Sequence, residues 1–224
     1  DMTMGGANLS NINIGDIYEI EIIKGGSAGV LFGDGATGGA VNIITKNPNF
    51  VRDELNLKTS LKSFSSKSKS FSYTKKLNNF VIQSFVSEED TQGYRENSKF
   101  KSDNFNFDLS FLKDPINRYF AKFSYSEQLT EIPGNITLTD FYTRPRYSRT
   151  PEDFGTEKVN SISIGSQNIL DSGNKFSNVL KFENKYEISS ALSCGRYILA
   201  RNNFESSTIS TKSIKKYKFN NLDL

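Results

Sequence analysis

The chain has 224 residues, of which 36% are hydrophobic and 24% are charged, and it combines 18 Phe and 10 Tyr with no Trp. Its net charge of +3 comes from interleaved acids and bases, which excludes the strong basic field of a nucleic-acid-binding protein. Its single cysteine, Cys194, excludes a disulfide framework and a four-cysteine zinc site, and the lack of His removes the commonest base and metal ligand. We therefore expect neither an enzyme nor a covalently bound cofactor, and we interpret Cys194 as an incidental thiol.

The sequence contains neither a predicted transmembrane helix nor a recognisable signal peptide. No run of about 18 apolar residues occurs, which excludes a transmembrane helix. Residues 1–8 lack the basic and apolar regions of a signal peptide. If the protein is exported, we expect the segment that directs export to lie outside these residues.

The amino-acid composition of the chain changes at residues 46–51, where we place a domain boundary. Before it, Ile, Val, Ala and Gly dominate, and glycine fills seven of the sixteen positions from 25 to 40. Residues 17–24 (IYEIEIIK) alternate Ile or Tyr with Glu, and residues 40–45 (AVNIIT) are rich in β-branched side chains, so both stretches predict strands. The predicted domains are residues 1–48 and residues 49–224.

After the boundary, apolar and polar side chains alternate over stretches of about ten residues, the length of a tilted membrane β-strand. The alternation is strictest at Phe105, Phe107, Leu109 and Phe111, and because the residues between them are polar, one face of this strand is apolar and the other polar. The same pattern recurs at Leu55, Leu57 and Leu61; at Tyr119, Ala121, Phe123 and Tyr125; at Ile162 and Ile164; and at Leu180, Phe182, Tyr186 and Ile188.

The connections between the predicted strands alternate in length. Residues 77–79 (LNN), 113–117 (KDPIN) and 171–174 (DSGN) predict tight turns, whereas residues 88–102 and 130–158 predict long loops. Apart from a short first link at residues 65–68, this alternation is typical of a transmembrane barrel. A soluble β-sandwich or propeller is the alternative, and the regular alternation counts against it. We expect two further strands in residues 189–224.

Gly33, Gly35 and Gly38 form the pattern G-x-G-x-x-G (GDGATG), which has three interpretations. In a dinucleotide-binding protein, the last glycine opens a helix whose amides face a pyrophosphate. Here residues 39–44 favour a strand, which argues against a nucleotide site. The second interpretation is a set of tight turns and bulges, where glycine supplies a positive φ or a close backbone approach.

The third interpretation is a resemblance. Residues 17–46 (IYEIEIIKGGSAGVLFGDGATGGAVNIITK) resemble the closing segment of the plug domain in TonB-dependent outer-membrane receptors, whose pattern runs I-x-x-I-E-V-L-R-G-P and then Y-G-x-G-A-x-G-G-V-I-N-I-I-T-K. The matching residues are Ile20, Glu21, Ile22, Ile23 and Gly25 in the first half, and Phe32, Gly33, Gly35, Ala36, Gly38, Gly39, Val41, Asn42, Ile43, Ile44, Thr45 and Lys46 in the second. Lys24 stands where the family usually has Arg, and Gly26 where it has Pro. Residues 92–98 (QGYRENS) resemble a D-G-Y-R-x-N-S loop that these receptors carry between early strands.

The resemblance implies an all-β membrane barrel entered by a small mixed plug. The C-terminal part of the plug would occupy residues 1–48, and residues 49–224 would form the first part of the barrel, with about eight or nine antiparallel strands of roughly 22. Such a sheet cannot close, so we expect the chain to be the interior of a longer protein. By resemblance, the plug motif and its seating against the barrel rest on Glu21, Lys24, Gly25, Gly33, Gly35, Gly38, Gly39 and Asn42. Lys24 keeps the charge of the family's Arg without its planar geometry, and the alternative is a solvated surface lysine with no role in seating.

The function that the resemblance implies is uptake of a scarce ligand, such as a ferric siderophore or another iron chelate. The receptor would lie in the outer membrane of a Gram-negative bacterium, and energised TonB would drive import by acting on the plug. The expected partners are TonB, through a segment outside this chain, together with outer-membrane lipid and a small-molecule ligand. No nucleic acid is expected.

The longest predicted loop interleaves guanidinium and aromatic side chains, which suits an anionic and planar ligand such as a ferric chelate. Its candidate ligand-binding residues are Tyr142, Arg144, Arg146, Tyr147 and Arg149. A solvated, mobile loop is the alternative. The sequence of this loop, including IPG at residues 132–134 and RPR at residues 144–146, is similar to a loop in receptors of the ferric-citrate and quinone-cofactor type.

Two rival classes of protein remain. A structural or adhesive outer-membrane β protein would have the same strands but would leave the match of residues 33–46 unexplained. A cytosolic nucleotide-binding enzyme would explain the glycine pattern, but it would need a helix after Gly38 and would not show the barrel pattern. A signal peptide and a TonB-binding segment upstream would favour the receptor.

Overall fold

The computed structural model describes residues 17–25, 38–45, 51–114, 117–169, 175–193, 196–214, 218–219 and 222–223. The chain divides into two compact units, Asp1–Val51 and Arg52–Leu224. In the described ranges, no helix is long and apolar enough to cross a membrane. The assignment of residues 1–48 to a plug and of residues 49–224 to a barrel stays a prediction.

The described part of the first unit is an antiparallel hairpin of β1 (Ile17–Lys24) and β2 (Gly39–Thr45). Both strands were predicted, and β2 follows Gly38 directly, so no dinucleotide-binding helix begins there. Gly39 has a φ of +137°, and a Cβ added to it would lie 2.7 Å from the carbonyl oxygen of Ile23. The chain therefore needs glycine where β2 begins, because any other residue would collide with β1.

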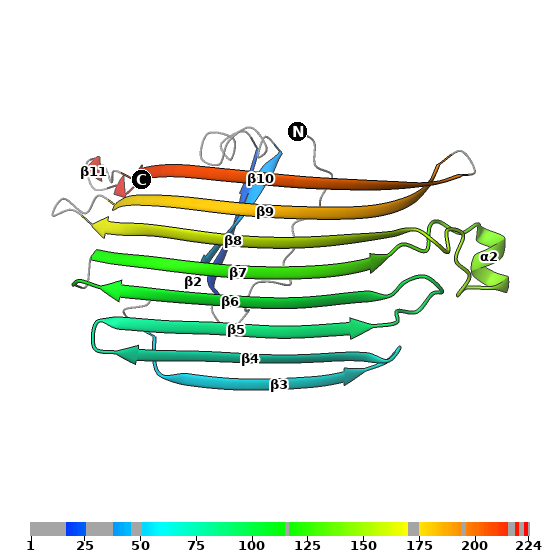
Figure 1. Ribbon diagram of the computed structural model, residues 1–224, viewed down its shortest axis with the longest axis horizontal. Coiled ribbons are helices and arrows are strands. Elements are labelled where there is room, and N and C mark those ends of the chain that lie inside the picture. The colour runs from blue at the N-terminus through cyan, green and yellow to red at the C-terminus, as the bar shows by residue number, and fades with distance from the viewer. Residues whose placement is uncertain are drawn as a thin grey trace. The chain divides into compact units, whose positions relative to one another are not determined.

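The second unit is an eight-stranded antiparallel sheet in which each strand pairs with the next one along the chain (Figure 1). Its strands are β3 (Glu54–Lys62), β4 (Ser66–Leu77), β5 (Phe80–Thr91), β6 (Phe100–Leu112), β7 (Asn117–Glu131), β8 (Phe154–Ile169), β9 (Lys175–Ser193) and β10 (Arg196–Ile214). Within the described residues, β3 and β10 each pair on one side, so the sheet is open. The predicted architecture of about eight or nine antiparallel strands that do not close is confirmed.

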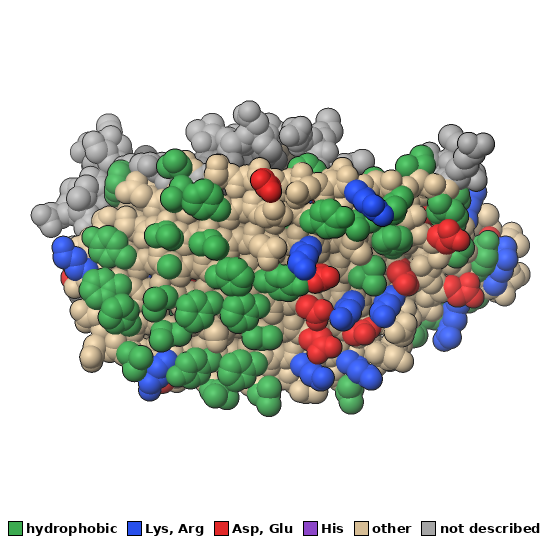
Figure 2. Space-filling view, viewed as in Figure 1, with side chains coloured by type: hydrophobic (Ala, Val, Ile, Leu, Met, Phe, Trp, Pro, Cys, Tyr) green, Lys and Arg blue, Asp and Glu red, His purple; other side chains and the backbone are tan. Residues whose placement is uncertain are grey.

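One face of the sheet is apolar because the register aligns the alternating side chains of neighbouring strands. Phe107 of β6 pairs with Phe123 of β7, and the adjacent pair, Phe105 and Tyr125, continues the same face. Many of these side chains are exposed, including Leu57 of β3 at 73%. Figure 2 shows hydrophobic side chains spread over the sheet toward the end with the short turns. An exposed apolar surface of this extent indicates contact with something other than water.

Charged residues cross the same face in a row nearer the other end of the strands (Figure 2). The register places five of them side by side on consecutive strands, namely Lys69, Glu88, Asp103, Glu127 and Lys158. Lys69 and Glu88 are 3.9 Å apart, and Glu127 and Lys158 are 3.8 Å apart. We call these five residues the charged row.

The opposite face of the sheet carries small polar residues in its buried part. Ser102 and Ser110 of β6 are both 0% exposed, and Asn104 lies between them on the same face. Asn104 Nδ2 donates to Ser102 Oγ at 3.0 Å and to Ser87 Oγ of β5 at 3.2 Å. Hydrogen bonds between side chains thus satisfy part of the polar interior, as a buried polar surface requires.

An ionic network on this polar face links β6 to β7. Asp108 Oδ2 lies 3.2 Å from Arg118 Nη2 and 3.0 Å from Lys122 Nζ. Arg118 also donates to Ser110 Oγ at 2.8 Å, and its guanidinium lies 5.0 Å from the centre of the Phe120 ring. The side chains of Asp108 and Arg118 are only 16% and 13% exposed, so their charges depend on each other for stabilisation.

The connections differ in length at the two ends of the sheet. Residues 78–79 connect β4 to β5 at one end of the sheet, and residues 63–65, 92–99 and 132–153 connect strands at the other. Part of the predicted turn at residues 113–117 and all of the predicted turn at residues 171–174 lie outside the described residues. In the described connections, the tight turn at residues 78–79 and the two long loops are present, but both long loops are shorter than predicted. β5 and β6 continue into residues 88–91 and 100–102, and β7 and β8 continue to Glu131 and from Phe154.

The last part of the chain differs from the prediction of two strands after residue 189. β9 continues to Ser193, and β10 pairs with it along its whole length. After β10 the structure describes a small pair of two-residue strands, β11 (Lys218–Phe219) and β12 (Leu222–Asp223). Polar residues fill the middle of β10, so sequence alone does not show its continuity.

Candidate ligand-binding loops

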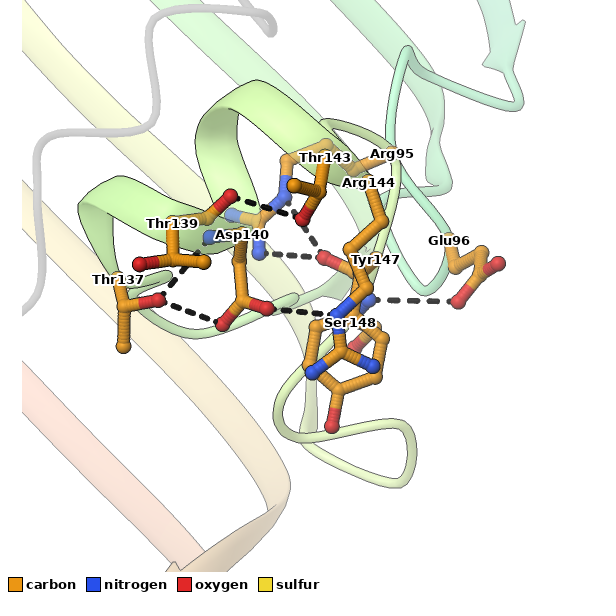
Figure 3. Close-up of polar contacts among 9 residues, drawn as sticks. All are labelled: Arg95, Glu96, Thr137, Thr139, Asp140, Thr143, Arg144, Tyr147 and Ser148. Atoms are coloured by element: carbon orange, nitrogen blue, oxygen red, sulfur yellow. Dashed lines mark hydrogen bonds and ion pairs between the residues drawn. The ribbon is translucent and has the colours of Figure 1, made fainter.

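The loop of residues 132–153 between β7 and β8 contains a short helix, α2 (Leu138–Thr143). Thr137 caps this helix, since its hydroxyl accepts from the backbone N–H of Asp140 at 3.1 Å and donates to Asp140 Oδ2 at 2.8 Å. The hydroxyl of Thr143 donates to the carbonyl of Thr139 at 2.8 Å. These local bonds shape the segment that carries Tyr142 and Arg144 (Figure 3).

Arg144 is the residue that follows α2, and its guanidinium forms an ion pair within the loop. Its Nε lies 2.6 Å from Asp140 Oδ1, one turn earlier, and its guanidinium lies over the ring of Tyr147 at 3.8 Å (Figure 3). The hydrogen bond from Arg144, followed by that from Thr137, lowers the pKa of Asp140 from its ordinary value. The hydrogen bond to Asp140 raises the pKa of Arg144 in turn.

The lowered pKa of Asp140 predicts that the order of α2 depends on pH. A carboxylate whose pKa is lowered by folding stabilises the fold above its ordinary pKa of 3.8, and this stabilisation is lost as the pH falls through the lowered value. We therefore expect a nitroxide label at Leu138→Cys, in a Cys194→Ser background of the full-length protein, to become more mobile below about pH 4. The Asp140→Asn variant should show a mobile label at every pH. A label whose mobility responds equally to pH in both proteins would contradict the role of Asp140.

Arg95, in the loop of residues 92–99 between β5 and β6, holds the longer loop in place. Its Nη1 donates to the carbonyl of Gly134 at 2.7 Å, its Nη2 to those of Pro133 and Tyr147 at 3.2 and 2.8 Å, and its Nε to Tyr147 again at 3.2 Å. The guanidinium therefore joins the two ends of the loop, before α2 and after it. Its fixed fork of donors suits this task, which an ammonium group would not fulfil.

Asn97 also binds carbonyl groups from both ends of this loop, at positions closer to the ends of β7 and β8. Its Nδ2 lies 3.1 Å from the carbonyl oxygen of Ile132, 2.6 Å from that of Thr150 and 2.9 Å from that of Asp153. Asn97 has a φ of 51°, a left-handed conformation that Asn adopts more readily than most residues. We call the side chains of Arg95 and Asn97, with the carbonyl groups that they bind, the latch.

Glu96 lies between the two latch residues and contacts the loop through its backbone and its side chain. Its N–H donates to the carbonyl of Arg146 at 2.8 Å. Its Oε2 accepts from the N–H of Ser148 at 3.3 Å (Figure 3). Ser148 is buried, at 3% exposed. The backbone of Arg146 is thus fixed from the neighbouring loop.

The structure places all five predicted ligand-binding residues in the loop of residues 132–153, which we call the latched loop, but in different surroundings. Tyr142 is 75% exposed and stands edge to face with Phe141 at 5.3 Å. Arg144 and Tyr147 stack on each other, whereas the guanidinium of Arg146 lies 5.4 Å from the ring of Tyr94 in the neighbouring loop. Arg149 is exposed, and its backbone N–H donates to the carbonyl of Pro133 at 3.0 Å. Their role in ligand binding stays a prediction.

The sequence did not predict the latch as part of the site. Residues 92–98 attracted attention only as a resemblance, which assigned them no role. The partners of Arg95 and Asn97 are backbone carbonyl groups, which every sequence contains. No complementary side chain therefore marks the contact in advance.

The predicted plug residues lie in the first unit, which is described by itself. Glu21 and Asn42 are cross-strand partners in the β1–β2 hairpin, and Asn42 Nδ2 donates to Glu21 Oε2 at 2.8 Å. Lys24 pairs with Gly39 at the end of the hairpin, followed by Gly25 with a φ of 74°. Gly38 is an exposed turn residue, and Gly33 and Gly35 lie outside the described residues. The seating of this motif against a barrel stays a prediction.

An open antiparallel meander with an exposed apolar face, short turns at one end and long loops at the other defines the class of fold. It is the fold of part of the barrel of a TonB-dependent outer-membrane receptor.

Solved structures with this fold include the ferric citrate transporter FecA in its unliganded form, with a TM-score of 0.75 and 18% identity. The siderophore receptor PiuA from Acinetobacter baumannii has a TM-score of 0.74 and 16% identity, and the ferric-catecholate import receptor Fiu from E. coli K12, in its open form, has 0.71 and 15%. These alignments cover 93%, 92% and 92% of this chain, but only 32%, 33% and 37% of the respective receptors. The chain thus spans about a third of their length. No family model and no curated protein sequence matches the chain.

Proposed function

We propose that this chain is part of a TonB-dependent receptor that binds an iron chelate and imports it across the outer membrane of a Gram-negative bacterium. The observation that carries the proposal is the likeness of the chain to FecA, PiuA and Fiu, whose names denote a transporter of ferric citrate, a siderophore receptor and an importer of ferric catecholates. The loop chemistry supports it independently, because the end with the long loops carries guanidinium and aromatic groups.

The apolar face of the sheet would contact outer-membrane lipid. Its exposed Phe, Leu and Ile side chains would form the outward band of a barrel, and the charged row would lie where the hydrocarbon gives way to lipid headgroups. The polar face, with the network around Asp108, would face the interior. In this orientation the latched loop projects to the outside of the cell.

The ligand would be captured by the latched loop and by parts of the receptor outside this chain. Tyr142, Arg144, Arg146, Tyr147 and Arg149 offer planar donors and rings to an anionic chelate. The latch holds the backbone of this loop before the ligand arrives, which lowers the entropy cost of binding. The receptor would alter no bond of the ligand.

Import would depend on the first unit acting as the end of a plug. The β1–β2 hairpin, with Glu21, Lys24, Gly25, Gly39 and Asn42, would seat against the barrel, and Gly33, Gly35 and Gly38 would belong to the same motif. Energised TonB, bound to a segment outside this chain, would deform the plug and release the ligand inward. Lys24 would provide the positive charge of the seat.

Energy-dependent uptake separates this proposal from a structural or adhesive role. We expect iron-starved cells with the full-length protein to accumulate radioactive iron from a ferric chelate, and we expect the same cells without TonB to bind the chelate but not to accumulate iron. Ferric citrate and a ferric catecholate are the probes to compare first. Binding of neither probe, with no growth defect when the gene is deleted under iron limitation, would contradict the proposed function.

A further inference from the structure

Three connections at the end of the sheet with the long loops bring two rings and a guanidinium close together. Phe64, from the turn between β3 and β4, stands edge to face with Tyr94, from the loop between β5 and β6, at 5.5 Å and 77°. The guanidinium carbon of Arg146, from the latched loop, lies 5.4 Å from the centre of the Tyr94 ring. Phe64 and Tyr94 are each 46% exposed. We call these three residues the platform.

Phe64 occupies a backbone position that suits it poorly. It has a φ of 59° and the next residue, Ser65, a φ of 54°, and the N–H of Ser66 donates to the carbonyl of Ser63 at 3.3 Å. Two left-handed residues at the centre of a hairpin turn favour Asn-Gly, whereas a bulky side chain there is strained. The carbonyl of Phe64 accepts from the N–H of Gln92 at 3.1 Å, which ties the turn to the loop of Tyr94. Strain retained for an exposed ring is a mark of a functional position.

Arg146 is the platform's charge, and its position is set by the neighbouring loop. Its carbonyl accepts from Glu96, beside Arg95 of the latch. Arg144 is neutralised by Asp140, but in the described part of the chain no carboxylate forms an ion pair with Arg146. The guanidinium therefore has an aromatic face on one side and unused donors for an anion.

From this geometry we infer that the platform binds an anionic chelate that presents an aromatic ring, as a catecholate does. The ring of the ligand lies against Phe64 and Tyr94, and a negatively charged oxygen binds to Arg146. An aliphatic chelate such as ferric citrate would use the guanidinium but would gain nothing from the two rings. The inference rests on the proposed function and specifies the ligand class of the same outer end.

The test compares two probes on the full-length protein, namely ferric 2,3-dihydroxybenzoate and ferric citrate. The variants are Phe64→Asn, which removes the ring and relieves the turn, Tyr94→Leu and Arg146→Gln. Each ring variant should weaken binding of the catecholate by about threefold to tenfold and leave citrate binding unchanged. Arg146→Gln should weaken both by about tenfold or more. The control variants are Phe141→Leu, for an exposed ring of the same loop, and Lys62→Gln, for an exposed cation beside the turn.

The outcomes separate this inference from the proposed function. Selective weakening of catecholate binding by the ring variants, with both controls unchanged, supports the platform. Tight binding of ferric citrate that no ring variant alters, with weak binding of the catecholate, overturns the platform and leaves the iron-chelate receptor standing. Binding of neither probe overturns both. The heat-dependent gel mobility of each variant shows that its barrel has folded.

Discussion

Replacing Arg95 by Ala is expected to release the loop of residues 132–153 from the neighbouring loop of residues 92–99. The variant loses all four hydrogen bonds that join Gly134, Pro133 and Tyr147 through one guanidinium. Hydrogen bonds from charged donors contribute about 1.5–3 kcal/mol each, and because these four act as one unit we expect the free energy of local opening to fall by about 3 kcal/mol. Amide hydrogen exchange in this loop should then be about a hundredfold faster.

Hydrogen exchange followed by mass spectrometry on the full-length protein measures this effect directly. Arg95→Lys should give an intermediate rate, because one ammonium group cannot reach three carbonyl groups in the geometry of a planar fork. Arg52→Ala, at an exposed arginine before β3, is the matched control and should change nothing in the loop. Exchange in residues 132–153 as slow in Arg95→Ala as in the natural protein would contradict the latch.

If the loop binds a chelate as proposed, loss of the latch should also weaken ligand binding, and this effect can be separated from the loss of a direct contact. Arg95 is half-buried and its donors bind backbone carbonyl groups of the loop, so its loss should weaken binding of a chelate by making the loop harder to order. Arg146→Gln should instead leave hydrogen exchange unchanged in the free protein and weaken the anion directly. The pair of variants therefore distinguishes a residue that holds the site from one that belongs to it.

The period of two in the sequence was sufficient to predict the barrel strands wherever apolar residues alternate with polar ones, as from Tyr119 to Tyr125. It failed at the ends of strands, because charged residues such as Glu88 and Lys158 lie there on the exposed face. By composition the sequence around these residues resembles a loop, although β5 and β8 include them. Where a row of charges borders an apolar band, the sequence pattern therefore places the end of the strand too early.

The sequence shows which loop carries guanidinium and aromatic groups, but it does not show the contacts that order this loop. Guanidinium and aromatic groups in residues 142–149 are visible in the sequence, but only the structure shows that Arg144 is neutralised by Asp140 and that Arg146 contacts Tyr94. Phe64 gave no signal at all, since its importance comes from a backbone angle and from a neighbour in another loop. Contacts between separate connections depend on the register of the whole sheet, which local patterns do not determine.

Removal of the Asp108 carboxylate is expected to destabilise the barrel more than any other single ionic change described. Asp108→Ala leaves the guanidinium of Arg118, 13% exposed, without its carboxylate. Breaking a buried ion pair in this way costs about 3 kcal/mol, which far exceeds the cost of losing an exposed pair. Unfolding of the full-length protein by urea in lipid vesicles, followed by far-UV circular dichroism, should show this loss. Asp103→Ala, which breaks a pair exposed at about 40% on each side, should cost less than about 1 kcal/mol.

A second substitution identifies the physical cause of that loss. If the unpaired guanidinium is responsible, the double variant Asp108→Ala/Arg118→Met should recover most of the stability, because it removes the stranded charge and retains an apolar side chain near Phe120. If the double variant is instead as unstable as Asp108→Ala, the carboxylate acts through its bonds to Ser110 and Lys122. Full stability of Asp108→Ala itself would mean that water on the polar face of the sheet solvates Arg118. The polar face would then be a wetted surface and not a packed one.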